Sequence, residues 1–174
     1  GEQWGYDEIN LNCGCPSDKV RDGAFGACLM RDPARVADAV AAMRAVVRVP
    51  VTVKMRIGTV DGGSADRAAV AREVDRFSAS DHDQLCGFVS QIAAAGCTVM
   101  IVHARKAVLG GFSPRDNREV PPLRYDVVQK LRAEFPALSF VLNGGLRTLP
   151  HCLDALQWCD GVMLGREAYH RPQL

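Results

Sequence analysis

Side chains able to bind or polarise a ligand recur at the ends of short apolar segments typical of β-strands. They are Asn10 and Asn12, Lys54 and Arg56, His103 and Arg105, Asn143 with Gly144 and Gly145, and Gly165 with Arg166. Polarity at a strand end is ordinary, because chains return there to water. Five such ends in succession, with these residue types, favour a binding face. In a parallel barrel the carboxyl ends of the strands open on one face, where active sites lie.

Alternation along residues 51–56 singles out Lys54. Val51, Val53 and Met55 share one face of the expected strand, whereas Lys54 and Arg56 share the other. The apolar set can pack under helices while the polar set points into the mouth of the barrel. Because lysine is almost never fully buried unless it is paired, Lys54 predicts an anionic or electron-rich partner.

The last two strand ends carry features of a phosphate site. Gly144 and Gly145 are adjacent, and Gly165 precedes Arg166. Adjacent glycines let a ligand approach the backbone, and free amides at a helix start bind phosphate. One Gly-Gly pair is usually just a turn. Two such loops after the last two strands predict a phosphate site, which is a frequent feature of barrels.

Strands and helices alternate along the chain. Strands are expected at 8–12, 51–56, 98–103, 139–143 and 161–165. Helices are expected after Asp32 and Pro33, from Asp81 to Gly96, and over 125–135 and 150–158. Residues 59–80, with a helical turn near 68–77, and 106–122 are expected to be loops. This order predicts an α/β fold with a parallel sheet, either doubly wound or a barrel. No Gly-x-Gly-x-x-Gly follows a strand, which weakens the dinucleotide-binding alternative.

Composition sets the broad class. The chain has 174 residues, of which 48% are apolar and 24% charged, typical of one globular domain, and its net charge of +1 shows no strong basic excess. No segment has the length of a membrane span. The seven cysteines include no Cys-x-x-Cys pair, so we expect neither a disulfide framework nor a metal site. A reducing cytoplasm is the expected location.

The most specific stretch runs from Asn12 through Cys13, Gly14, Cys15 and Pro16, and continues at Gly23–Met30. It resembles the tRNA-dihydrouridine synthases. The segments 53–58, 103–107, 143–145 and 165–166 match that family in order, and 117–123 is similar to its DusA subfamily. The resemblance implies a (β/α)8 TIM barrel, of which residues 1–174 would supply about five C-terminal βα units of the FMN-binding catalytic domain. The family's helical tRNA-binding domain would lie beyond this chain, and residues 59–80 are longer than the family's usual connection.

The family reduces uridine in the D-loop of tRNA to dihydrouridine, with FMN recharged by NADPH. The resemblance implies hydride transfer from reduced FMN and protonation of the neighbouring carbon by Cys15. An ordinary thiol is mostly protonated at neutral pH and can serve as an acid. Cys13 shares the parity of Ile9 and Leu11 and is expected to pack, as are the other five cysteines.

Further roles follow from the resemblance, position by position. Lys54 and His103 match residues that contact flavin, although a core packing role is the alternative for the histidine. Asn143, Gly144, Gly145, Gly165 and Arg166 match the phosphate end. Asn12 matches a residue that meets tRNA beside the target base. A basic loop near the mouth would grip RNA backbone, although such runs are more often solvated; it contains Arg105, Lys106, Arg115, Asn117 and Arg118.

Two other functions stay open at the level of sequence. One is an FMN-barrel oxidoreductase that acts on a free pyrimidine or a small enone. It would need Lys54 and the phosphate loops but not the basic loop. The other is a non-catalytic fragment that binds RNA or nothing. Competition by bulk tRNA would separate the first from a tRNA enzyme, and flavin absorbance would identify the second.

Overall fold

A five-stranded parallel sheet forms the centre of the molecule, a computed structural model of which describes residues 1–17, 23–64 and 66–174. Its strands lie in the order β1 (Ile9–Cys13), β2 (Val51–Arg56), β4 (Val99–His103), β6 (Ser139–Asn143) and β7 (Gly161–Met163). Arg56 lies beside His103, and His103 beside Asn143, so the polar ends are in register. The predicted strands are confirmed within about two residues at each end.

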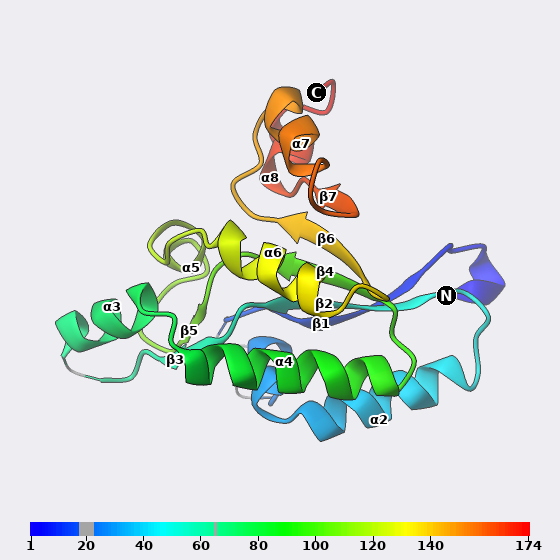
Figure 1. Ribbon diagram of the computed structural model, residues 1–174, viewed down its shortest axis with the longest axis horizontal. Coiled ribbons are helices and arrows are strands. Elements are labelled where there is room, and N and C mark those ends of the chain that lie inside the picture. Colours follow the sequence, from blue (N-terminus) through cyan, green and yellow to red (C-terminus); the bar gives the residue numbers. More distant parts are fainter. Residues whose placement is uncertain (18–22, 65) are drawn as a thin grey trace.

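A helix follows each strand of the main sheet, so that the chain returns to the amino-terminal end of the sheet before the next parallel strand begins (Figure 1). They are α2 (Pro33–Arg44), α4 (Ala79–Ala94), α6 (Tyr125–Glu134) and α7 (Leu149–Ala155), with α8 (Arg166–His170) after β7. The arrangement is that of about five βα units of a (β/α)8 barrel, which confirms the predicted fold class. In Figure 1, α2 and α4 lie side by side along the sheet.

Local signals explain where the two long helices begin. The side chain of Asp32 accepts from the amide of Arg35, with Pro33 at the first turn of α2. Helix α4 begins after Ser78, which forms a capping box with Asp81, so its start precedes the predicted Asp81. Short 3-10 helices η1 (Glu2–Trp4) and η2 (Gly26–Arg31) complete the N-terminal part.

The core lies between the sheet and its helices. The predicted inward residues of β2, which are Val51, Val53 and Met55, are at most 2% exposed. They belong to one apolar cluster with the predicted stripe of α4, formed by Leu85, Phe88, Val89 and Ile92. The alternation of the strands therefore separates a helix-facing core from side chains directed to the opposite face and to the carboxyl edge.

Two segments expected to be loops contain a second sheet. β3 (Thr59–Asp61) pairs in parallel with β5 (Ala107–Leu109), and two further helices, α3 (Arg67–Asp75) and α5 (Asp116–Glu119), flank them. Helix α3 corresponds to the predicted helical turn. Strands of three residues are too short to show alternation, so the sequence concealed them. Along the chain, β3 follows β2 and β5 follows β4. Because β2 and β4 are neighbours in the main sheet, the two short strands also lie side by side.

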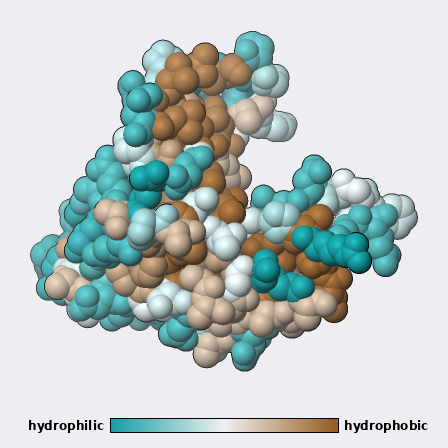
Figure 2. Space-filling model, turned by 45° about the vertical axis from the view of Figure 1, so that its right-hand side comes forward, coloured by the Kyte–Doolittle hydropathy of each residue, from teal (hydrophilic) through white to brown (hydrophobic). Residues whose placement is uncertain are grey.

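The molecule is hollowed between the part that carries α7 and α8 and the N-terminal part, and apolar surface lines this hollow (Figure 2). Leu149 and Leu153 of α7, and Leu156 directly after it, are each more than 40% exposed. The edge strands β1 and β7 each have one neighbour among the described residues. Within the described ranges, no helix is both long enough and apolar enough to cross a membrane.

Candidate active site

The carboxyl ends of the five strands surround a cavity of about 400 Å³. It brings together ten of the residues that the sequence nominated. These are Asn12, Cys15, Lys54, His103, Arg118, Asn143, Gly144, Gly145, Gly165 and Arg166. Clustering at this edge was the expectation for a parallel barrel, and the cavity shows it for these residues.

The cavity is strongly cationic. Lys54, Arg56, Arg118, Arg147 and Arg166 line it, against the single carboxylate of Glu167. Arg147 was not singled out by sequence, because it lies in a loop between Leu146 and Thr148 with no strand-end pattern. A cavity with this charge balance suits an anionic ligand, and arginine side chains offer paired donors to phosphate or carboxylate oxygens.

Lys54 lies in a short chain of hydrogen bonds that crosses the sheet. Its Nζ donates to Oδ1 of Asn143 at 3.1 Å, and Nδ2 of Asn143 donates to the carbonyl of Met163 at 2.8 Å. Within the described residues, no carboxylate pairs with Lys54. Burial, and then the charge of Arg56, lower the pKa of Lys54 to about 8. Among the residues that the structure describes, the ammonium therefore has no charged partner, so its charge is available to a ligand.

His103 is held as a neutral imidazole. Burial, followed by the charges of Arg56 and Lys54, lowers its pKa to about 2. Its ring lies directly against Gly144, where a Cβ atom would come within 2.5 Å of the ring carbon Cδ2. A neutral ring offers one donor and one acceptor, so His103 can hydrogen-bond a ligand without adding charge.

Gly144 and Gly145 form a turn that no larger residue fits. Their φ angles are +107° and +73°. The hydroxyl of Tyr125 donates to the carbonyl of Gly144 at 2.6 Å and anchors the turn from below. The Gly-Gly pair is therefore required by the backbone itself, and it also leaves the floor of the cavity open to a ligand.

Cys15 is held by its backbone. The amide of Ala27 donates to the carbonyl of Cys15 at 2.8 Å, and a Cβ on Gly26 would lie 2.5 Å from that oxygen. Before it, Gly14 donates its amide to Oδ1 of Asn12 at 3.0 Å. The side chain of Cys15 is half-buried in the wall of the cavity. The loop thus presents a thiol at a defined place.

Cys13 differs from Cys15 in its surroundings. It is 0% exposed and belongs to the main core, as its parity predicts. Burial, and secondarily Cys97, raise its pKa to about 12, so the thiol stays protonated and inaccessible. Cys13, which packs in the core, and Cys15, which lines the cavity, are thus only two positions apart in the sequence.

Arg56 joins three segments around the site. Its Nε donates to the carbonyl of Gly14 at 3.2 Å, and its Nη1 donates to the carbonyls of Lys106 and Asn117 at 3.3 and 3.0 Å. It is 3% exposed, and burial, with the nearby Arg105, lowers its pKa to about 10. The sequence placed Arg56 at a strand end but assigned it no role. Its parity with Lys54 was the available signal.

The predicted basic loop requires correction. Lys106 is 2% exposed and Asn117 is fully buried, so neither side chain is accessible to RNA. Both serve the fold: Lys106 pairs with Asp81, and Asn117 bonds the backbone of Val108 in both directions. A buried polar group must find such partners, and a run of basic letters does not reveal them.

The other three members of that loop separate. Arg105 is half-buried and donates to the carbonyl of Pro121, away from the cavity lining. Arg115 is exposed and pairs with Glu119 at 3.3 Å. Arg118 lines the cavity, and its Nε is buried with no hydrogen-bond partner in the described part of the chain. Of the five residues of the predicted basic loop, Arg118 alone lines the cavity.

The whole chain, residues 1–174, matches the dihydrouridine synthase family. It is 53% identical over 171 residues to a tRNA-dihydrouridine(20/20a) synthase of Xanthomonas campestris, covering 98% of this chain and 46% of that protein. Proteins of the same name from Pseudomonas syringae and Pseudomonas aeruginosa are each 52% identical over 173 residues, with 99% of this chain and 46% and 47% of theirs covered. The chain spans about half the length of these relatives. By its match and by the identity of its relatives, this chain belongs to the dihydrouridine synthase family.

Proposed function

We propose that this chain carries the FMN-binding catalytic site of a tRNA-dihydrouridine synthase that reduces uridine in the D-loop, with NADPH as the reductant. The observation that carries the proposal is the placement of Cys15. Its thiol lies in the wall of a cationic cavity at the carboxyl edge of the sheet, within a backbone held from both sides. The names of the relatives support a tRNA substrate.

The residues present fit a flavin mononucleotide. The open turn at Gly144 and Gly145, with Gly165 and Arg166 beside it, suits a phosphate group. Lys54 would face the electron-rich ring, and neutral His103 would add a hydrogen bond. The Nε of Arg118, which has no hydrogen-bond partner among the described residues, is a further donor that a bound anion would satisfy. When bound, FMN supplies hydride for one carbon of the uracil double bond and is reduced again by NADPH.

The protein's own part of the reaction is proton donation and positioning. In our proposal, Cys15 donates its proton to the uracil carbon next to the one that receives hydride. Arg56 acts as a positioning residue, because it bonds the carbonyl of Gly14 directly before the thiol. The target base must leave its stack to enter such a cavity.

Contacts to RNA form the outer part of the proposal. Asn12 lines the cavity beside Cys15 and would meet tRNA next to the target base. Arg118 in the wall, Arg115 on the surface and the half-buried Arg105 would contact backbone phosphates. Such contacts supply affinity and register more than sequence readout. A cytoplasmic location, where unpaired cysteines stay reduced, belongs to the same proposal.

The test compares two cysteines. Cys15→Ala should retain FMN and still be reduced by NADPH, because the thiol takes no part in either step. Oxidation of the reduced protein by unmodified tRNA in a single turnover should slow by about 10² to 10⁴, the usual contribution of a general acid. Cys13→Ala is the matched control, and should lose stability through its core cavity while reacting at the parent rate.

Opposite outcomes overturn the assignment. A parent rate for Cys15→Ala would move the proton donor elsewhere. If a free pyrimidine oxidises the reduced protein and bulk tRNA does not compete, the substrate is a small molecule and the tRNA part of the proposal fails.

A further inference from the structure

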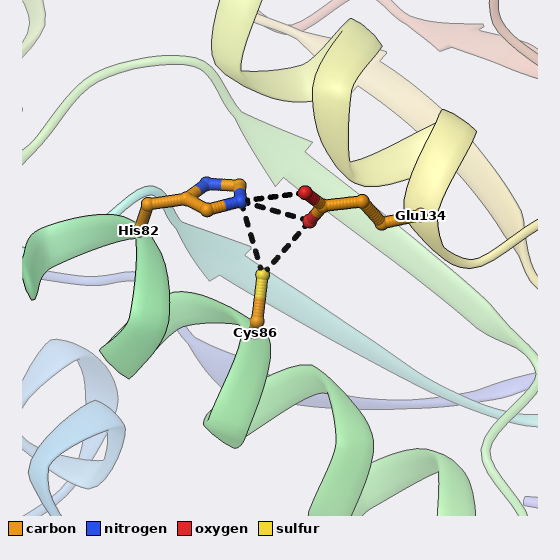
Figure 3. A group of neighbouring side chains, drawn as sticks. All are labelled: His82, Cys86 and Glu134. Carbon is orange, nitrogen blue, oxygen red and sulfur yellow. Dashed lines mark hydrogen bonds and ion pairs between the residues drawn. The ribbon is translucent and has the colours of Figure 1, made fainter. Parts of the chain in front are cut away.

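Three side chains with metal-binding atoms converge between helices α4 and α6 (Figure 3), and none of them lines the cavity. His82 and Cys86 lie one turn apart on α4, and Glu134 is the last residue of α6. Nε2 of His82 lies 2.8 and 3.0 Å from the two carboxylate oxygens of Glu134. Sγ of Cys86 lies 3.1 Å from Oε2 of Glu134 and 3.4 Å from that same Nε2.

The shape of this group distinguishes it from a catalytic relay. In a cysteine–histidine–acid relay, the thiol and the carboxylate contact different ring nitrogens. Here both approach Nε2, while Nδ1 of His82 is buried with no partner within the described residues. Atoms of three ligand types thus face one common point. Figure 3 shows the imidazole and the carboxylate directed toward each other with the thiol below them.

From this convergence we infer a divalent transition-metal site, with Zn²⁺ as the fitting ion, formed by His82, Cys86 and Glu134. Thiolate, imidazole and carboxylate together suit Zn²⁺ and exclude the hard ions Mg²⁺ and Ca²⁺ as preferred occupants. The sequence indicated no metal site, because its ligands come from two segments without the Cys-x-x-Cys pattern. It also assigned Cys86 to packing alone, whereas the thiol is hydrogen-bonded and half-buried.

The distances are compatible with closure on a metal. In a tetrahedral zinc site the nitrogen, sulfur and oxygen ligands lie roughly 3.3–3.7 Å apart. The three atoms here lie 2.8–3.4 Å apart, so separation by roughly half an ångström admits the ion. The Glu134 side chain is 39% exposed, which leaves a fourth position for water. Binding releases the thiol proton to solvent, because the thiolate is the ligand.

The site would tie α4 to α6 across 48 residues of sequence. Two features set its strength. Among the residues that the structure describes, Nδ1 of His82 has no hydrogen-bond acceptor of the kind that usually supports a metal-bound imidazole, and Lys130 lies 3.8 Å from Oε1 of Glu134. We therefore expect an affinity on the order of micromolar, weaker than that of a four-ligand structural zinc site.

Cobalt titration tests the site directly. Co²⁺ added to the purified protein should give a thiolate-to-cobalt charge-transfer band that saturates at one equivalent and disappears when Zn²⁺ is added. Zn²⁺ at about 100 times its dissociation constant should raise the melting temperature by roughly 5–10 °C. Cys86→Ala should abolish the band, and Glu134→Gln, at an exposed helix end, should weaken binding about tenfold or more.

Cys28→Ala is the matched control, since Cys28 is also half-buried but lies outside the group. It should keep the band and the thermal shift. Circular dichroism confirms that each variant is folded. A protein that gives no charge-transfer band at saturating Co²⁺, or a band that survives Cys86→Ala, overturns the inference. If Cys86→Ala fails to fold, an unchanged affinity in Glu134→Gln overturns it equally.

Discussion

Lys54 and Lys106 differ in their surroundings, although both lie at apolar strands: Lys54 lies within β2, and Lys106 directly precedes β5. Lys106 is enclosed: its Nζ donates to Oδ1 of Asp81 and to the carbonyl of Glu73, each at 3.1 Å, and lies 5.7 Å above the ring of Phe77. Within the described part of the chain, the Nζ of Lys54 has only the neutral amide of Asn143 as a hydrogen-bond partner. Lys106 is thus paired within the protein, whereas Lys54 lines the cavity.

The difference separates stability from binding. A buried cation with a carboxylate, a carbonyl and an aromatic face around it holds the second sheet to α4, and needs no ligand. A half-buried cation without a charged partner remains costly until an anion arrives. In our proposal, what marks Lys54 as the ligand-binding lysine is that no carboxylate pairs with it among the described residues, and neither its charge nor its position in a strand is sufficient.

The largest expected effect is on stability, at Lys106. Lys106→Met should lower the free energy of unfolding by about 3 kcal/mol, because it removes the buried cation that pairs with Asp81. Asp81 keeps its hydrogen bonds with Ser78 in this variant. FMN affinity of the folded protein should be unchanged. Urea denaturation and FMN titration measure the two. Arg115→Met, at an exposed pair, is the control and should show no resolvable change in stability.

The comparison fails if Lys106→Met weakens FMN binding while its urea midpoint stays at the parent value. Such a result would mean that Lys106 takes part in FMN binding despite its burial.

The second effect is on binding, at Lys54. Lys54→Met should weaken FMN binding by roughly tenfold to a hundredfold, the usual range for losing a charged hydrogen-bond donor. Its free energy of unfolding should be unchanged or higher, because an unpaired half-buried cation is removed. Equilibrium FMN titration and urea denaturation of the same preparations check both. A loss of stability with full FMN affinity would reverse the roles of the two lysines.

The smallest effect is on pH dependence. Because the pKa of Lys54 is lowered to about 8 in the free protein, its charge is present below that pH and lost above it. FMN affinity should therefore fall above pH 8, by at most about tenfold per pH unit. Titrations between pH 7 and 9.5 measure this slope, and Lys54→Met should lack it. An equal slope in the variant would assign the titration to another group.

Stability should change in the opposite sense over that range. Between the lowered pKa of about 8 and the ordinary value of 10.5, the unfolded chain binds the proton that folded Lys54 has lost. The free energy of unfolding should therefore rise with pH there, as far as this group contributes. Weaker binding with unimpaired stability distinguishes loss of charge from general unfolding.

The strands and the carboxyl-edge residues were predictable because their signals are local. Alternation over five or six residues identified β2 and placed Lys54 on the face opposite to that of Val53. The parity of Cys13 with Ile9 and Leu11 indicated packing, whereas Cys15 lies beyond the end of the strand. The residues 59–61 and 107–109 escaped detection because three residues carry no period. Helix α4 was predicted from Asp81, two residues after its first residue Ala79, because the capping box at Ser78 lies within a polar stretch.

Several parts of the site were not predictable from sequence. Arg56 bonds carbonyls 42 to 61 residues away, and a carbonyl acceptor leaves no mark on residue type. The basic loop misled for the same reason. From residue type alone, Lys106 and Asn117 are expected on the surface. Their burial becomes visible only in the folded structure.

By itself, the sequence determined the order of strands and helices, the edge at which polar side chains gather, and which of two nearby thiols packs in the core. These follow from periods of two and about four residues, which neighbouring letters encode. Only the tertiary structure decided which cations find partners and which three side chains meet between α4 and α6. Lys106 reaches Asp81 across 25 residues, and Cys86 reaches Glu134 across 48. Contacts over such separations depend on how helices pack on the sheet, and no local pattern records that packing.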